Sequence, residues 1–274
     1  MRESETVHQP PHSCLLRGFS CPTLLPVLPH PPLKQHYADS KEKPVFVKKI
    51  FDEGAEHYDP VVGWGFFGQG KSYRKWALER HGLKPGMKLL DVASGTGLVA
   101  AAAAEILGSS EPITCVDPSD GMLAVARKKL DDATFIRAGA EELPLPDKAF
   151  DFLSVGYALR HFGDLGAAFR EFHRVLRPGG TVLLLEATKP SNPVGAALFR
   201  MYFGHIYPAL TKVFTGSDKA KLMMRYFWET MDACVRPESI LDELRGARFV
   251  EVERTRMAAI FSEYSAQRKG SRDQ

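Results

Sequence analysis

The 274-residue sequence predicts an α/β fold with a doubly wound, mostly parallel sheet. Three observations lead to this prediction. Short apolar runs alternate with helical patterns over residues 87–185, a turn of small residues follows the first run, and the run at 249–255 alternates apolar with polar residues. Strands that alternate with helices require right-handed crossovers, which make neighbouring strands parallel.

Seven strands are expected, the last one antiparallel, at residues 87–92, 113–117, 134–137, 150–155, 181–185, 249–255 and 258–264. The patterns between and beside them predict helices at residues 45–57, 71–81, 98–107, 119–130, 165–176 and 237–244. The helix at 165–176 has a plausible N-cap in Asp164 and places its apolar residues on one face. The Pro178-Gly179-Gly180 sequence ends it, and Pro237 and Gly246 bound the last helix.

The chain divides by composition into a domain and two tails. Residues 1–43 are rich in Pro and His without an apolar period, which predicts a disordered tail. Residues 44–264 form the expected domain, with a helical, aromatic-rich lid inserted at about residues 190–235. Residues 265–274 are expected to be a second disordered tail.

Composition excludes several classes of protein. The formal net charge is only +3 and the basic residues are interleaved with acids, so no nucleic-acid partner is expected. No apolar run approaches the roughly 20 residues that span a bilayer, so no stable membrane insertion is expected. Four scattered cysteines without a CxxC pair predict neither a disulfide scaffold nor a metal site. A reduced, cytoplasmic location follows.

The segment at residues 89–98 carries the chemistry. A strand runs into a turn of small residues that opens a helix, so the backbone can approach a ligand and free N–H groups favour negative charge. Gly95, Gly97 and Ala100 fit a dinucleotide fingerprint, and Asp117 follows Gly97 by 20 residues (117 − 97), where it can hold a ribose. These features alone fit both NAD and S-adenosylmethionine.

Asp91 separates the two cofactors. Its carboxylate precedes the glycines and would repel a dinucleotide pyrophosphate, whereas it would attract a methionine ammonium. The sequence therefore favours S-adenosylmethionine, with an NAD-dependent oxidoreductase as the alternative. The simpler interpretation of Asp91 is a carboxylate that caps nearby amides of the turn.

On these residues the sequence resembles the class I, Rossmann-like methyltransferases, and specifically the family that methylates ubiquinone and menaquinone precursors. The resemblance runs from about residue 47 to 249 and rests on blocks in the family order at residues 91–97, 140–144, 158–160, 174–180 and 185–186. Residues 50–51 and 58–59 also resemble the family's N-terminal helix.

The resemblance implies a set of cofactor-binding residues. Those at the methionine end and the ribose are Asp91, Ala93, Ser94, Gly95, Gly97 and Asp117. Those near the adenine and the reactive centre are Met122, Gly139, Ala140, Glu141 and Tyr157. Gly139 departs from the Asp or Asn that family members often carry, which leaves the backbone there to contact the adenine.

The resemblance also places three candidate catalytic residues. Arg160 matches the family's arginine and would stabilise a phenolate or order a water. His161 stands where asparagine is frequent and is a candidate base, although a loop-capping role is the simpler interpretation. His205 matches a histidine of the lid, where it either lines the acceptor pocket or packs. The family's C-terminal strand motif is absent from residues 254–261, which weakens the quinone assignment.

The function expected from the sequence is methyl transfer from S-adenosylmethionine to a small, partly apolar acceptor, with a carbon atom of a quinone precursor as the first choice. The alternatives are O- or N-methylation of another metabolite, the NAD-dependent oxidoreductase, and a non-catalytic scaffold that retains the fold. The expected partner is the small-molecule acceptor, and a homodimer is left open.

Overall fold

The computed structural model describes residues 26–39, 41–65, 70–190, 192–257 and 260–270. In this part of the chain the strands form one seven-stranded sheet in the order β3-β2-β1-β4-β5-β7-β6. The strands are β1 (Leu89–Val92), β2 (Ile113–Val116), β3 (Thr134–Ile136), β4 (Phe150–Gly156), β5 (Leu176–Ala187), β6 (Phe249–Met257) and β7 (Phe261–Arg268). β1 to β5 are mutually parallel, and β7 is antiparallel to β5 and β6. The predicted fold class is confirmed.

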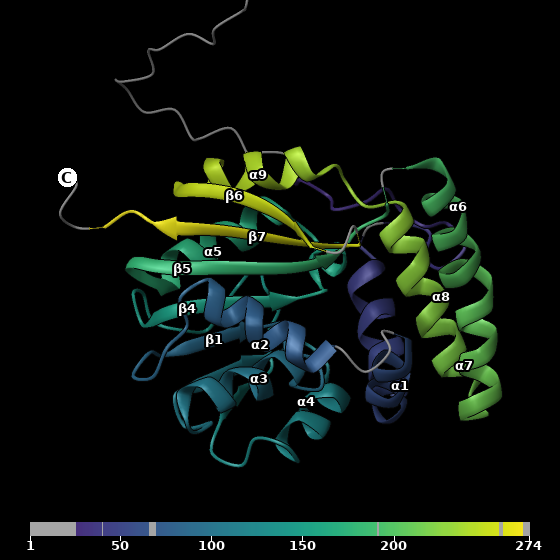
Figure 1. Ribbon diagram of the computed structural model, residues 1–274, viewed down its shortest axis with the longest axis horizontal. Helices are drawn as coiled ribbons and strands as arrows, with labels where there is room; N and C mark the ends of the chain where they lie inside the picture. Colours follow the sequence, from purple (N-terminus) through teal and green to yellow (C-terminus); the bar gives the residue numbers. More distant parts are fainter. Residues whose placement is uncertain (1–25, 40, 66–69, 191, 258–259, 271–274) are drawn as a thin grey trace, which may run out of the picture.

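Helices cover both faces and one end of the sheet (Figure 1). The N-terminal ones are α1 (Lys43–Gly65), α2 (Gly70–Arg80), α3 (Leu98–Leu107) and α4 (Asp120–Arg127). After β4 come the 3₁₀ turn η1 (Leu159–His161) and α5 (Leu165–Val175). The last group is α6 (Pro193–Met201), the π-helical turn η2 (Tyr202–Ile206), α7 (Tyr207–Thr215), α8 (Asp218–Asp232) and α9 (Pro237–Gly246). Helices α6 to α8 occupy the segment for which the sequence predicts a lid.

Successive side chains of each strand point to opposite faces of the sheet, so the hydrophobic core has one part on each face. Leu90 and Val92 of β1 pack with α5 and α9, whereas Leu89 packs with α2 and α3. A third cluster joins the lid to α1 through residues such as Phe203 and Met223. The parallel strands are buried on both sides, which explains their nearly continuous apolar sequences.

Helix α1 extends eight residues past its expected end at 57, and Pro60 lies inside it. Tertiary contacts account for the extension, because Val61 and Val62 are buried and the hydroxyl of Tyr207 donates to the carbonyl of Val61 at 2.7 Å. In Figure 1, α1 stands between the carboxyl ends of the parallel strands and the lid helices α6 to α8. It therefore covers the edge of the sheet where ligands bind in this class of fold.

The predicted disordered tails are wrong in part. Residues 26–39 lie against the domain, with the amide of Val27 donating to Asp164 and the amide of Val235 donating to the carbonyl of Pro29 at 2.7 Å. His30 and Tyr37 are buried. A proline-rich segment cannot form a helix or a ladder, but its carbonyls and side chains can still pack on a surface, which composition does not reveal. Residues 1–25 lie outside the described residues.

The C-terminal boundary also differs from its prediction at residue 264. β7 continues to Arg268 and pairs with the second half of β5, with Ala266 opposite Val182 and buried. The chain beyond residue 270 lies outside the described residues. No helix in the described part of the chain combines the length and apolar character needed to cross a membrane.

Candidate active site

A crevice of about 260 Å³ opens at the carboxyl ends of β1, β2 and β4. This is the switch point of the sheet, because the chain adds β2 and β3 on one side of β1 and β4 and β5 on the other. A smaller cavity of about 40 Å³ adjoins the crevice beside β1 and shares with it Tyr58, Ala93, Gly95, Gly156 and Tyr157. The two cavities together form the candidate site.

Asp91, near the end of β1, supplies a buried carboxylate to the smaller cavity. The hydroxyl of Ser154 donates to its Oδ1 at 2.7 Å, and its Oδ2 has no hydrogen-bond partner among the described residues. Burial raises the pKa of this carboxyl to about 7. An unpaired buried carboxylate is costly, so its position facing a cavity indicates a cationic ligand.

Arg74 of α2 lines the same small cavity. Its guanidinium lies 5.4 Å from the centre of the Tyr157 ring, and its Nε has no partner in the described part of the chain. A buried cation and a buried anion therefore border one space. The sequence analysis missed Arg74, because nothing in the pattern of α2 shows which of its basic residues turns inward.

The turn after β1 has a left-handed backbone that faces the crevice. Ala93, Gly95 and Gly97 all have positive φ, at 52°, 55° and 78°. A Cβ on Gly95 would meet nothing within 4 Å, whereas one on Gly97 would lie 3.2 Å from the Cβ of Ala126. Gly95 and Ser94 border the candidate site, whereas Gly97 lines neither cavity and allows the close approach of α4. Its contact with a cofactor stays a prediction.

Asp117 follows β2 and lines the crevice from the neighbouring strand. Its Oδ2 accepts from the amide of Gly95 and its Oδ1 from the amide of Ser119, both at 2.8 Å. Burial raises the pKa of this carboxyl to about 6. Each oxygen keeps a lone pair that can accept from a ligand hydroxyl. The carboxylates of Asp91 and Asp117 therefore both border the site, and burial raises the pKa of each.

The other predicted cofactor residues also line the crevice, as Met122, Gly139, Ala140, Glu141 and Tyr157. Met122 is buried on α4, where its sulfur can pack against an aromatic ring. The Glu141 carboxylate accepts from the amide of Gly163 at 2.5 Å, which closes the loop around the far end of the crevice. Gly139 has space at its Cβ position up to the Glu141 carboxylate, 3.2 Å away.

Helix α1 supplies a wall that the sequence analysis did not assign. Val47, Lys48, Phe51 and Tyr58 line the crevice from this helix, and Tyr58 faces the smaller cavity as well. Burial raises the pKa of the Tyr58 phenol, so the phenol stays protonated at neutral pH. The resemblance at residues 50–51 and 58–59 was the available signal, but it identified a helix and not its position over the cofactor site.

His161 is the one predicted catalytic residue that lines the crevice. Its ring lies 5.1 Å from that of Phe51 and stacks on Tyr226 at 5.6 Å, and its Nδ1 has no partner among the described side chains and backbone. Burial lowers the pKa of His161 well below the ordinary value of 6.5. The imidazole is therefore neutral and has a free nitrogen at physiological pH.

Arg160 lies elsewhere. Its side chain is buried, with Nη1 donating to the carboxylate of Glu186 at 2.8 Å and the guanidinium 4.2 Å from the centre of the Phe227 ring. It borders a separate cavity of about 280 Å³, together with Lys189, Arg236 and Arg254. The prediction that Arg160 faces the reacting centre is not supported by this placement, because the ion pair with Glu186 turns the side chain away from the crevice.

His205 is also apart from the crevice. It lies exposed in η2 and borders a shallow groove on the outside of α6 with Arg200 and Met201. The structure thus places His205 outside the crevice, and a role for it toward the acceptor stays a prediction. The match to a family histidine identifies a position in the lid, and it does not give the direction in which the π-turn η2 presents that residue.

The arrangement can bind a molecule with an amino-acid head, a ribose and an aromatic base. The Asp91 carboxylate fits an ammonium and Arg74 fits a carboxylate, while Asp117 fits ribose hydroxyls. The apolar wall of α1 excludes water from the space between them. No group of three or more His, Cys, Asp or Glu side chains suited to a metal ion was found among the residues described.

The chain is similar to known methyltransferases in sequence and in fold. The model of the ubiE/COQ5 methyltransferase family matches residues 37–261. The "Ubiquinone/menaquinone biosynthesis C-methyltransferase UbiE" of Shewanella woodyi is 32% identical over 225 residues, which cover 80% of this chain and 88% of that protein. The "Demethylmenaquinone methyltransferase" of Staphylococcus aureus is 34% identical over 185 residues, or 66% of this chain and 77% of that protein.

Solved structures share the fold at lower identity. A possible histamine N-methyltransferase from Thermotoga maritima has a TM-score of 0.57 at 18% identity, over 81% of this chain and 99% of that one. A phosphoethanolamine N-methyltransferase from Haemonchus contortus, in complex with S-adenosyl-L-methionine, has a TM-score of 0.57 at 20% identity, over 80% of this chain and 57% of that one. These likenesses establish the methyltransferase fold.

Proposed function

The chain belongs to the ubiE/COQ5 methyltransferase family, and we propose on this basis that it methylates a carbon atom of a quinone precursor with S-adenosylmethionine as the methyl donor. The observation that carries the choice of methyl donor is the buried Asp91 carboxylate, whose free oxygen borders the same cavity as Arg74.

The charges of the site support the choice of cofactor. S-adenosylmethionine carries an ammonium, a carboxylate and a sulfonium, so its methionine end complements a site that holds Asp91 and Arg74. A dinucleotide would place its pyrophosphate near the Asp91 carboxylate, where the two negative charges repel each other. The NAD-dependent oxidoreductase is therefore the weaker alternative.

The remaining residues have roles that follow from their places in the crevice. Asp117 would accept from the ribose hydroxyls, and Met122 would pack on the adenine beside the backbone of Gly139 and Ala140. When bound, the cofactor supplies an electrophilic methyl group and its own leaving group. The protein then has to align the acceptor, exclude water and accept a proton.

The acceptor would lie against the apolar residues of α1. Phe51 and Val47 with Phe162 give the crevice an apolar lining suited to an aromatic ring. His161, held neutral beside Phe51, is the candidate to accept the proton that leaves the acceptor. The quinone class comes from the names of the relatives, both of which act in menaquinone biosynthesis or on demethylmenaquinone. The cytoplasmic location stays a prediction.

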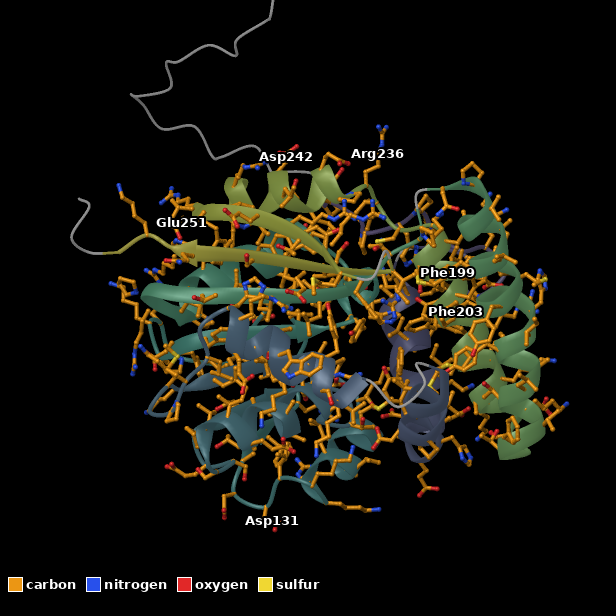
Figure 2. The ribbon with its side chains drawn as sticks, viewed as in Figure 1. Asp131, Phe199, Phe203, Arg236, Asp242 and Glu251 are labelled. Carbon is orange, nitrogen blue, oxygen red and sulfur yellow. The ribbon has the colours of Figure 1, made fainter. Side chains whose placement is uncertain are left out.

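Calorimetric titration of S-adenosylmethionine tests the cofactor site. Asp91→Ala and Arg74→Met should each weaken binding by about a hundredfold, because each removes one partner of a desolvated ion pair. Asp131→Ala is the matched control, since Asp131 lies exposed at the edge of the molecule (Figure 2). Wild-type affinity in Asp91→Ala, or tighter binding of NADH than of S-adenosylmethionine, would refute the assignment.

The acceptor needs a second measurement. Incubation with methyl-labelled S-adenosylmethionine and a demethylated quinone should give a product whose label resists acid and base hydrolysis, as a carbon-bound methyl does. A label released as methanol or found on nitrogen would refute carbon methylation but leave the cofactor assignment in place.

A further inference from the structure

A buried carboxylate of β7 binds the end of helix α2. Glu263 is fully buried, and its Oε1 accepts from Nη2 of Arg80, the last residue of α2, at 2.6 Å. Its Oε2 accepts from Nε of Arg80 at 3.3 Å and from Nε2 of His81 at 2.9 Å. Although burial acts in the opposite direction, these bonds hold the pKa of the Glu263 carboxyl below its ordinary value. The carboxylate is therefore ionised at neutral pH and ties α2 to the sheet.

An aromatic ring of β7 contacts the same helix nearer its start. Phe261 and Glu263 point to the same face of the sheet, because side chains alternate along a strand. The ring of Phe261 stacks on that of Tyr73, with the ring centres 4.8 Å apart. Tyr73 and Arg80 are two helical turns apart, so they lie on one side of α2. β7 therefore contacts this side of α2 at two points, which fixes the rotation of the helix about its own axis.

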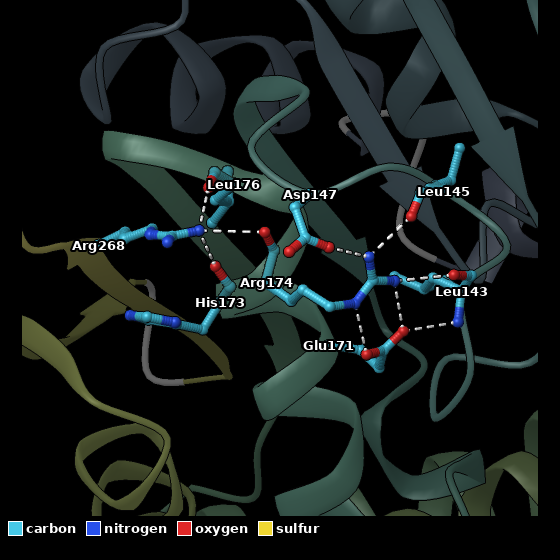
Figure 3. Close-up of polar contacts among 8 residues, drawn as sticks. All are labelled: Leu143, Leu145, Asp147, Glu171, His173, Arg174, Leu176 and Arg268. Atoms are coloured by element: carbon cyan, nitrogen blue, oxygen red, sulfur yellow. Dashed lines mark hydrogen bonds and ion pairs between the residues drawn. The ribbon is translucent and has the colours of Figure 1, made fainter.

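β7 is itself anchored to the domain by bonds that do not involve α2. Along its length it pairs with β5 on one side and with β6 on the other. At its far end, Nη1 of Arg268 donates to three backbone carbonyls at the end of α5 and the start of β5 (Figure 3). These belong to His173, Arg174 and Leu176, at 2.6, 3.0 and 2.6 Å. The strand is therefore a fixed support against which Glu263 can hold the helix.

The place of the Arg74 guanidinium follows from the place of α2. Arg74 is one residue after Tyr73, about 100° further around the helix, and lines the smaller cavity of the candidate site. A Cβ on Gly70 would lie 2.7 Å from Nη1 of Arg74, so the guanidinium packs against the first turn of its own helix. Arg74 and α2 therefore move as one body, and a rotation or shift of the helix displaces the guanidinium relative to Asp91.

We propose that Glu263 is a positioning residue for cofactor binding, because it fixes α2 on β7 so that Arg74 meets the carboxylate of S-adenosylmethionine. Glu263 lines neither cavity of the candidate site, so it acts through the helix and does not touch the cofactor. The inference rests on the role proposed above for Arg74 at the methionine end of the cofactor. A direct electrostatic effect of the Glu263 charge on the cofactor is the rival explanation, and it would not depend on Arg74.

A double-mutant cycle, measured by calorimetric titration of S-adenosylmethionine, tests the proposal. Glu263→Gln should weaken binding by about tenfold. In an Arg74→Met background the same substitution should weaken binding by less than about twofold, because no guanidinium is left to displace. The matched control is Glu251→Gln, the same substitution at an exposed acid of the neighbouring strand β6 (Figure 2), and it should bind as the wild type does. Thermal unfolding of each variant shows whether the fold is intact.

A second variant keeps the test decisive if Glu263→Gln misfolds. The Arg80 side chain is 40% exposed, so Arg80→Met should fold and should weaken binding by about threefold, again only when Arg74 is present. Wild-type affinity in the folded Glu263→Gln variant, or in Arg80→Met, overturns the inference alone. An equal loss with and without Arg74 also overturns it, in favour of the electrostatic explanation. Wild-type affinity in Arg74→Met refutes both the inference and the role proposed for Arg74.

Discussion

The crevice beside β1 and the cavity beside Arg160 both contain buried charge, but they satisfy it differently. In the crevice, the free oxygen of Asp91 has no partner among the described residues, and burial raises its pKa. In the cavity beside Arg160, the guanidinium of Arg160 forms an ion pair with Glu186, and Glu186 also accepts from the amide of Leu159 at 2.8 Å. The charge of Asp91 is therefore available to pair with a ligand, whereas the charges of Arg160 and Glu186 pair with each other and stabilise the fold.

This difference in pairing distinguishes residues that bind a ligand from residues that stabilise the fold. A buried charge without a partner lowers the stability of the free protein and is retained when a ligand completes it. A buried ion pair gives its partners a fixed geometry, and loss of one partner is costly because it leaves the other charge buried and uncompensated. Substitutions in the two cavities should therefore change stability in opposite directions.

The largest expected change in the free energy of unfolding comes from a substitution in the cavity beside Arg160. Arg160→Met leaves the Glu186 carboxylate buried without a cationic partner, so the free energy of unfolding should fall by about 3–5 kcal/mol in urea denaturation. The double variant Arg160→Met/Glu186→Gln should recover most of this loss. If Arg160→Met unfolds like the wild type, the pair does not support the fold and the contrast between the cavities fails.

The opposite effect is expected at Asp91. Asp91→Asn should raise the free energy of unfolding of the cofactor-free protein by about 1–3 kcal/mol at pH 8, because it removes a buried charge and keeps the bond from Ser154. The pKa of Asp91 is raised from 3.8 to about 7, so the folded protein holds a proton that the unfolded chain loses. Wild-type stability from this group therefore falls as pH rises from about 4 to 7.

The advantage of Asp91→Asn should accordingly shrink as pH falls from 7 toward 4. Urea denaturation of both proteins across this range measures it. A variant that is less stable than the wild type at pH 8 would mean that the Asp91 carboxylate is already paired in the free protein, contrary to the contrast drawn above.

The smallest expected effect is the pH dependence of S-adenosylmethionine binding, which tests whether the charge of Asp91 serves a ligand. An ammonium can pair with Asp91 only in its ionised form, so S-adenosylmethionine binding should release a proton and weaken as pH falls below about 7. Affinity should drop by about tenfold between pH 7.5 and pH 5.5. Calorimetry in buffers of different ionisation enthalpy measures both quantities, and Asp91→Asn serves as the control whose affinity should be flat. Affinity that rises at low pH would contradict the role of Asp91.

Local patterns were enough to predict the sheet and half of the site. The strand that ends at Asp91, the small-residue turn and Asp117 all lie within 30 residues, so spacing along the chain places them at one edge. Arg74, Tyr58 and the whole wall of α1 come from a distant segment. Their inward orientation depends on packing against the finished domain, and no short-range period encodes it.

Three segments lie in places that the sequence patterns did not indicate. Arg160 matches a family block, but its direction is set by Glu186, 26 residues later and on another strand. His205 was assigned from its match to a family histidine of the lid, and the structure places it exposed on the outside of α6. Residues 26–39 were assigned by composition, although their packing depends on single contacts such as Val27 with Asp164.

Because of the π-turn, the fold of the lid depends more on the number of residues in this segment than on the identity of their side chains. Each residue of a helix corresponds to about 100° of rotation, so deleting one residue within Tyr202–Ile206 would turn everything after it by more than a quarter of a revolution. Val213 would swing inward and Tyr207 would leave its place over α1. Over these five positions, a change in length would therefore do more harm than a conservative substitution.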